Sequence, residues 1–140
     1  MNQTLWARMH GGATHFPIAL LMVSMVFDHA GFWWRNELRR REFHAVGFHS
    51  LLVAVAASPG AVLSGLALSK GQLFGTGALA MHHYFVWPAF GLMIGLAVWR
   101  FVMREREARR VGGRYLVLAT LAVVSMMAAG YSGGEMIIGQ

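Results

Sequence analysis

Four long, almost uncharged apolar segments constrain this chain more than any other feature of its sequence. They cover residues 14–34, 45–69, 77–99 and 115–131 and together occupy most of the 140 residues. A helix needs about 20 apolar residues to cross a hydrocarbon layer about 30 Å thick. Residues 1–140 are therefore predicted to form a single all-α membrane domain, with no stretch left over for a separate soluble domain.

The basic residues predict how the four segments cross the membrane. Ten of the twelve Lys and Arg residues lie within residues 35–41 and 100–114, and the other two are Arg8 and Lys70. Short basic connections stay in the cytoplasm. We therefore expect an up-down-up-down four-helix bundle in a bacterial cytoplasmic membrane, with both termini on the outer, periplasmic side. Because the arginines flank helix ends and mix with glutamates, lipid is the expected partner of this charge and nucleic acid is not.

Four sequence stretches resemble one family of bacterial membrane proteins, the family of domain of unknown function 2231. The stretches are HGGATHFPIALLMVSMVFD, GAVLSGLALSKG, AMHHYFVWPAFGLMIGLAVWR and AAGYSGGEMIIG. The opening motif is the most specific part, and here it consists of His10, His15, Phe16, Pro17 and Ile18. Family members often have proline after the first histidine, where this chain has Gly11. The resemblance implies a membrane fold and leaves the function to be argued from the residues.

The seven histidines fall into two groups by depth, and none lies near the middle of a segment. The outer group comprises His10, His15, His82 and His83, and the inner group comprises His29, His44 and His49. Ionisable residues inside membrane spans are rare and point to functional sites. The simplest alternative is that each imidazole only forms a hydrogen bond to a neighbouring group.

Spacing along the first segment suggests a cofactor. His15 and His29 are 14 residues apart, which places them about 40° apart around a helix and roughly 21 Å apart along it. One helix with this pattern can ligate two stacked haems, as in membrane cytochromes b, which the chain resembles in this respect alone. Haem iron accepts a neutral imidazole on each axial side. The chain has no cysteine, so any haem b, one or two, is expected to be bound without covalent attachment.

Each predicted haem needs a second histidine at matching depth. For the outer haem we predict His83 as the partner of His15, with Gly91 clearing space. For the inner haem we predict His49 as the partner of His29, with Gly60 on the same face. The other histidines are alternative ligands: His82, His10 and His44, of which His44 is expected near the headgroups. Asp28 is expected to be an interfacial acid beside the arginines. The alternative is that it forms a proton-relay pair with His29 or accepts a hydrogen bond that orients that imidazole.

Two functions remain open at this point. The first is a small b-type cytochrome-like subunit that passes electrons between a periplasmic redox partner, such as a c-type cytochrome, and the quinone pool or a respiratory complex. The second is a cofactor-free subunit that anchors or supports a larger membrane complex. No catalytic residues are predicted, because no outer domain could hold a substrate. A divalent metal bound by the outer histidines with Glu135 is a weaker third alternative.

Overall fold

The computed structural model describes residues 3–103 and 111–138, which form four helices and confirm the predicted all-α architecture. Each helix is long and apolar enough to cross a membrane. The helices extend beyond the predicted apolar segments, because polar and charged residues continue them at their ends. Their bounds are α1 Gln3–Trp33, α2 Glu37–Leu68, α3 Ala78–Met103 and α4 Gly113–Ile138.

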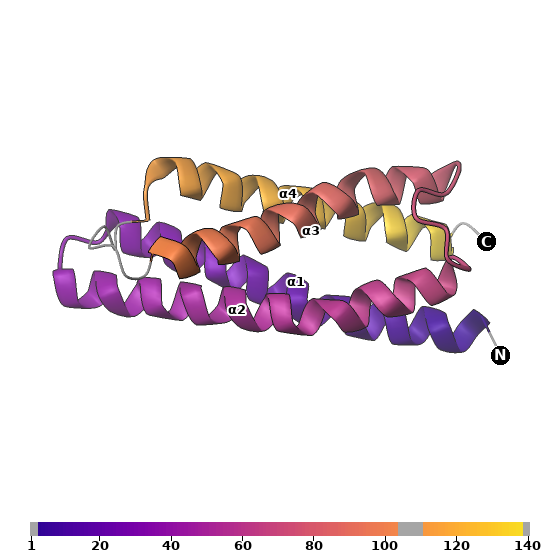
Figure 1. Cartoon of the computed structure of the whole chain (residues 1–140), viewed down its shortest axis with the longest axis horizontal. Helices are drawn as coiled ribbons and strands as arrows, with labels where there is room; N and C mark the ends of the chain where they lie inside the picture. Colours follow the sequence, from indigo (N-terminus) through magenta and orange to yellow (C-terminus); the bar gives the residue numbers. More distant parts are fainter. Residues whose placement is uncertain (1–2, 104–110, 139–140) are drawn as a thin grey trace.

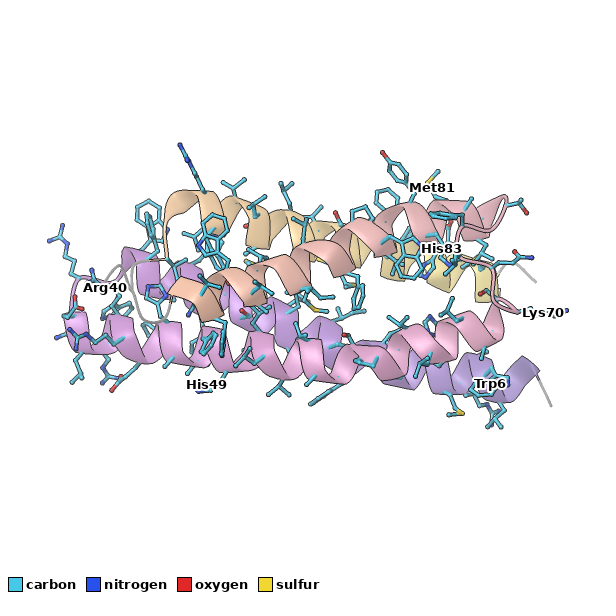
Figure 2. All side chains as sticks on the ribbon, in the orientation of Figure 1. Trp6, Arg40, His49, Lys70, Met81 and His83 are labelled. Carbon is cyan, nitrogen blue, oxygen red and sulfur yellow. The ribbon has the colours of Figure 1, made fainter. Side chains whose placement is uncertain are left out.

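The four helices run alternately up and down, and both termini lie at one end of the bundle together with the loop between α2 and α3 (Figure 1). We call this the terminal end. The opposite end carries the turn between α1 and α2 and the side chain of Arg40 (Figure 2), and we call it the arginine end. Four of the arginines used to predict the topology, Arg104, Arg106, Arg109 and Arg110, lie outside the described residues.

Local sequence signals explain how the chain reverses direction. The Asn36 side chain caps α2 by accepting a hydrogen bond of 3.1 Å from the backbone N–H of Arg39, as polar residues do at helix starts. The other end of α2 stops where Lys70 and Gly71 adopt φ angles of 55° and 80°. The Gly71 N–H then donates to the carbonyl of Leu66 at 2.8 Å, which closes the helix end.

Three prolines lie inside helices: Pro17 in α1, Pro59 in α2 and Pro88 in α3. A helix over the apolar segment 14–34 would have Pro17 in its first turn, where proline is tolerated. Because α1 begins at Gln3, Pro17 instead lies well inside the helix. The polar residues before the apolar segment continue the helix, and the Pro17 ring is buried.

Packing divides the bundle into two antiparallel hairpins, α1–α2 and α3–α4, each of which is much more closely packed within itself than against the other. The buried core contains many alanines, which allow helix backbones to approach closely in lipid. Large apolar side chains project outward along all four helices (Figure 2), where lipid would surround them. The core residues shared by the hairpins include Leu21, Leu51, Ala54, Met93, Leu96, Tyr115, Ala122 and Val123.

Candidate functional site

The predicted outer ligands His15 and His83 lie in different environments. The His15 side chain is exposed, and its Nδ1 donates to the carbonyl of Gly11 in its own helix. His83 is 8% exposed, and its buried Nδ1 has no hydrogen-bond partner among the described residues. The His83 ring instead lies against Trp87 and His82, with ring centroids 5.9 Å and 5.7 Å away. The structure therefore does not bring His15 and His83 together.

A different histidine pair does meet at the terminal end. His10 of α1 and His82 of α3 come from opposite hairpins, and their ring centroids are 6.4 Å apart at an interplanar angle of 81°. The Nδ1 of His10 contacts the carbonyl of Ala61 at 3.0 Å and the hydroxyl of Ser64 at 3.2 Å. The Nδ1 of His82 contacts the carbonyl of Ala129 at 2.8 Å. Both residues were predicted only as alternative ligands.

Two glycines make room for these imidazoles. A Cβ atom at Gly65 would lie 2.9 Å from Cε1 of His10, and a Cβ atom at Gly133 would lie 3.2 Å from Nδ1 of His82. The glycines predicted to clear cofactor space, Gly60 and Gly91, are instead exposed, and a Cβ there would meet nothing within 4 Å. The small residues Gly65 and Gly133 therefore leave room at the terminal end for the rings of His10 and His82.

The predicted inner ligands are also separated. His29 is oriented by two contacts, from Nδ1 to the carbonyl of Met25 at 2.9 Å and from Nε2 to the hydroxyl of Thr120 at 3.4 Å. His49 projects from the outer face of α2 (Figure 2), where its Nδ1 donates to the carbonyl of Ala45 at 2.7 Å. His29 thus points toward α4, whereas His49 points away from the bundle.

The interior of the arginine end holds a buried ion pair in place of a histidine pair. Asp28 is fully buried, and Nη1 of Arg100 donates to its Oδ1 and Oδ2 at 2.6 Å and 2.7 Å. Nδ1 of His44 lies 3.2 Å from Asp28 Oδ1, and Nη2 of Arg100 donates to the His44 carbonyl at 2.7 Å. Asp28 and His44 are thus buried inside the bundle, and Asp28 lies beside an arginine, as expected, although that arginine belongs to another helix. Their depth in a membrane stays a prediction.

Aromatic rings and glycines surround this ion pair. The guanidinium carbon of Arg100 lies 5.4 Å from the ring centroids of both Phe48 and Tyr115, a distance at which cation–π attraction operates. A Cβ atom at Gly47 would lie 2.5 Å from Asp28 Oδ1, so only glycine leaves room for the carboxylate. We call Asp28, His44, Arg100 and Tyr115 the clamp, because each residue belongs to a different helix.

The packing face of α1 provides the sequence signal for these residues. Its buried positions Pro17, Leu21, Ser24, Asp28 and Gly31 repeat at intervals of three and four, the spacing of a helix face packed against neighbours. His10 continues this stripe seven residues before Pro17, whereas His15 lies off it. A polar residue on this stripe faces the neighbouring helices, and that signal identifies both His10 and Asp28.

No group of three or more His, Cys, Asp or Glu residues within residues 3–103 and 111–138 is arranged to hold a metal ion. The proposed convergence of outer histidines with Glu135 on a divalent metal is therefore not found in this part of the chain.

Comparison with known protein families identifies the family of this chain. The family model described as "Predicted membrane protein (DUF2231)" matches residues 8–139. The chain belongs to the DUF2231 family. The match confirms the resemblance seen in the sequence, and no curated protein or solved structure matches the chain.

The opening DUF2231 motif thus separates into inward and outward residues in this chain. His10 is half-buried and Pro17 is buried, whereas His15 and Phe16 are exposed. The motif therefore places one imidazole toward the opposite hairpin and another on the outer surface of α1.

Proposed function

We propose that this DUF2231 protein is a small b-type cytochrome-like membrane protein that would hold one haem at the terminal end, with His10 and His82 as the residues that bind the iron. The observation that carries this proposal is the separation of the two imidazoles. Two imidazoles that bind one metal through bonds of about 2 Å have ring centroids about 5–6 Å apart. The centroids of His10 and His82 lie 6.4 Å apart, close to that range.

The hydrogen bonds of the pair support the same assignment. A carbonyl oxygen can only accept, so each Nδ1 that faces a carbonyl must carry the proton. The neutral imidazole then presents its lone pair at Nε2, the atom that binds iron. Metal-binding histidines commonly have their second nitrogen fixed in this way by a backbone carbonyl. Both imidazoles are therefore in the tautomer that leaves the lone pair of Nε2 available for iron.

The buried environment of His83 adds a second polar group to the proposed site. Its Nδ1 has no partner among the described residues, and buried polar atoms normally have one. His83 follows His82 directly and can offer this nitrogen to a polar group of the cofactor. A bound haem supplies one-electron chemistry, and the protein supplies ligands, burial and orientation.

The distribution of charge suggests where such a site would lie in the cell. The arginine end would face the cytoplasm of a bacterium, because short basic connections are retained there. The terminal end and its histidines would then face the periplasm, near an outer redox partner such as a c-type cytochrome. Electrons would pass between that partner and the quinone pool or a respiratory complex.

A cofactor-free anchoring subunit is the second candidate, and the clamp favours it. Asp28, His44 and Arg100 satisfy one another without any added group, so α1, α2 and α3 have a polar attachment of their own. In this alternative His10 and His82 are packing residues only.

The absorption spectrum of the purified chain separates the two candidates. We expect a reduced α-band typical of haem b and a stoichiometry of one haem per chain. His10→Ala and His82→Ala should each remove most of the haem. His15→Ala and His49→Ala are matched controls with exposed imidazoles and should retain it.

A colourless wild-type protein after expression with sufficient haem would overturn the cytochrome proposal and select the anchoring subunit. Haem loss in His15→Ala together with full haem in His10→Ala would instead restore the original ligand prediction.

A further inference from the structure

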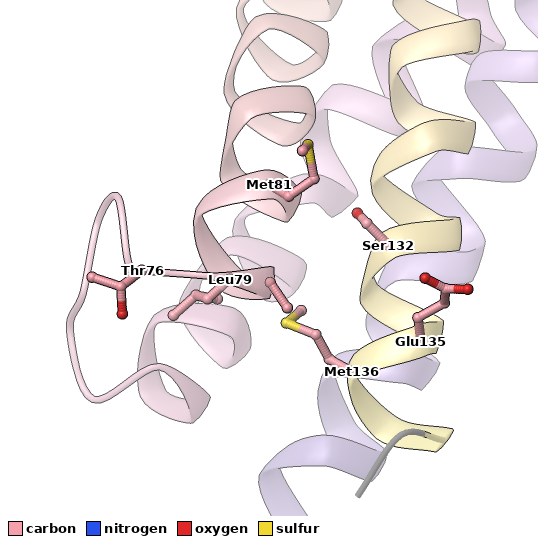
Figure 3. A pocket seen from close by; sticks show the side chains of 7 residues that line it. Thr76, Leu79, Met81, Ser132, Glu135 and Met136 are labelled. Atoms are coloured by element: carbon pink, nitrogen blue, oxygen red, sulfur yellow. The ribbon is translucent and has the colours of Figure 1, made fainter.

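A pocket of about 550 Å³ lies at the terminal end between the start of α3 and the end of α4 (Figure 3). Met81 points from α3 toward α4, while Ser132 and Met136 point from α4 toward α3. Glu135 and Thr76 add polar groups to the lining. The volume falls within the range of pockets that hold small organic ligands, about 300–1,000 Å³.

From this lining we propose that the pocket binds the hydroxylated aromatic headgroup of a membrane quinol. Methionine sulfur atoms make favourable contacts with aromatic rings, and two methionines line this pocket. The Ser132 hydroxyl can donate to a ring oxygen or accept from one. The Glu135 carboxylate is an acceptor suited to a ring hydroxyl. A flat ring with polar oxygens matches this combination better than an alkyl chain does.

The pocket is connected to the proposed haem ligand through one carbonyl. Ser132 Oγ donates to the carbonyl of Ala129 at 3.0 Å, and His82 Nδ1 donates to the same carbonyl at 2.8 Å. Gly133, the next residue of α4, packs against the His82 ring. If a ligand engages the Ser132 hydroxyl, the Ala129 carbonyl is left to His82 alone. The pocket and the ligand histidine therefore share one turn of α4.

The location also suits a molecule that arrives through the membrane. The pocket opens between two helices at the end of their apolar spans, next to Met81, which is 55% exposed. A quinol has an apolar tail that can remain in lipid while its headgroup enters between α3 and α4. The role of the pocket in electron transfer rests on the proposed function, whereas binding of the quinol headgroup does not require haem.

Binding of a benzoquinol with a decyl tail, kept reduced and measured by quenching of tryptophan fluorescence in the detergent-purified full chain, tests the inference. Ala78 is exposed and lines the pocket, so Ala78→Phe should fill it and weaken binding at least tenfold. Ser132→Ala should weaken binding about fivefold, the effect of one hydrogen bond. Ala67→Phe and Ser125→Ala are the matched controls, and both should bind as the wild type does.

Equal affinity of Ala78→Phe, Ser132→Ala and the wild type would overturn the quinol site. Displacement of the quinol by phosphatidylglycerol with equal potency in all variants would also overturn it, because the pocket would then not select the headgroup. Haem content measured on the same samples keeps the two proposals separate. A haem-free chain that binds the quinol refutes the cytochrome alone, and a haem-loaded chain that does not bind the quinol refutes the pocket alone.

Discussion

The two ends of this bundle differ in how completely their buried polar groups are hydrogen-bonded. At the arginine end the Asp28 carboxylate receives hydrogen bonds from Arg100 and His44, and Arg100 is also held by a carbonyl. At the terminal end His10 and His82 each use one nitrogen on a backbone carbonyl, and the Nδ1 of His83 has no partner among the described residues. A closed polar network stabilises a structure, whereas an incomplete one is suited to binding.

The difference also concerns which helices are joined. The clamp connects all four helices and so fastens the two hairpins at one end. The hairpins otherwise pack weakly against each other, which leaves the terminal end the easier place to admit a ligand between them. A bundle fixed at one end and adaptable at the other is a reasonable framework for a haem between α1 and α3.

Labelling of introduced cysteines gives the largest expected effect, because it is all or none. The chain has no cysteine of its own. In intact cells a membrane-impermeant maleimide should label Lys70→Cys at the terminal end and should not label Arg39→Cys at the arginine end. After permeabilisation both variants should react.

Labelling of Arg39→Cys in intact cells with no reaction at Lys70→Cys would show that the bundle has the opposite orientation in the membrane. The His10–His82 pair would then face the cytoplasm, and a periplasmic redox partner would be excluded.

Removal of one member of the clamp gives the next largest effect. Asp28→Ala leaves Arg100 buried without its carboxylate, which typically lowers the free energy of unfolding by about 3–5 kcal/mol. Arg100→Ala should do the same, whereas the double variant Asp28→Leu/Arg100→Met should recover much of the loss, because no unpaired charge remains. Unfolding in detergent and the yield of monodisperse protein measure both effects.

The exposed pair Arg39–Glu42, with its side chains 66% and 55% exposed, is the matched control. Glu42→Ala should change the free energy of unfolding by less than about 1 kcal/mol. An equally small change in Asp28→Ala would mean that the clamp does not hold the hairpins together.

The sequence predicted the helices well because their determinant is local. The apolar length of each segment and the positions of its flanking arginines depend on nothing outside that segment. The sequence alone therefore predicts four helices in the observed order. The position of each histidine along the bundle axis was equally predictable, because each residue of a helix advances along its axis by about 1.5 Å. The two groups of histidines do lie near opposite ends.

The direction in which each side chain points was harder, because it depends on the neighbouring helices. The angle between His15 and His29 relates these residues to each other but not to the face of α1 that packs. Arg100 was interpreted as a topology signal because its partner, Asp28, is 72 residues away in the chain. Only the association of the two hairpins brings these charges together.

A single methyl group added to Gly47 should give an intermediate effect. Its Cβ would lie 2.5 Å from Asp28 Oδ1, a distance that real atoms do not tolerate, so the carboxylate or α2 must move. Overpacking of this kind typically lowers the free energy of unfolding by about 1–3 kcal/mol. In Asp28→Ala/Gly47→Ala the two losses should not add, because the obstructed carboxylate is gone. Additive losses would show that Gly47 acts independently of the clamp.

The same methyl group at Gly133 should give the smallest loss of stability and identifies the end where binding matters. Its Cβ would lie 3.2 Å from His82 Nδ1, so a shift of the imidazole by a few tenths of an ångström accommodates it. Gly95, where a Cβ meets nothing within 4 Å, is the matched control, and Gly95→Ala should be neutral or stabilise by about 0.5–1 kcal/mol. We expect Gly133→Ala to unfold within about 1 kcal/mol of the wild type, because the gain in helix propensity offsets the crowding. Its haem spectrum or haem affinity should nevertheless change, since the displaced ring is a proposed ligand. If Gly133→Ala and Gly95→Ala have the same haem content and spectrum, the His82 ring is not held at the metal by this contact, and the contrast between the two ends weakens accordingly.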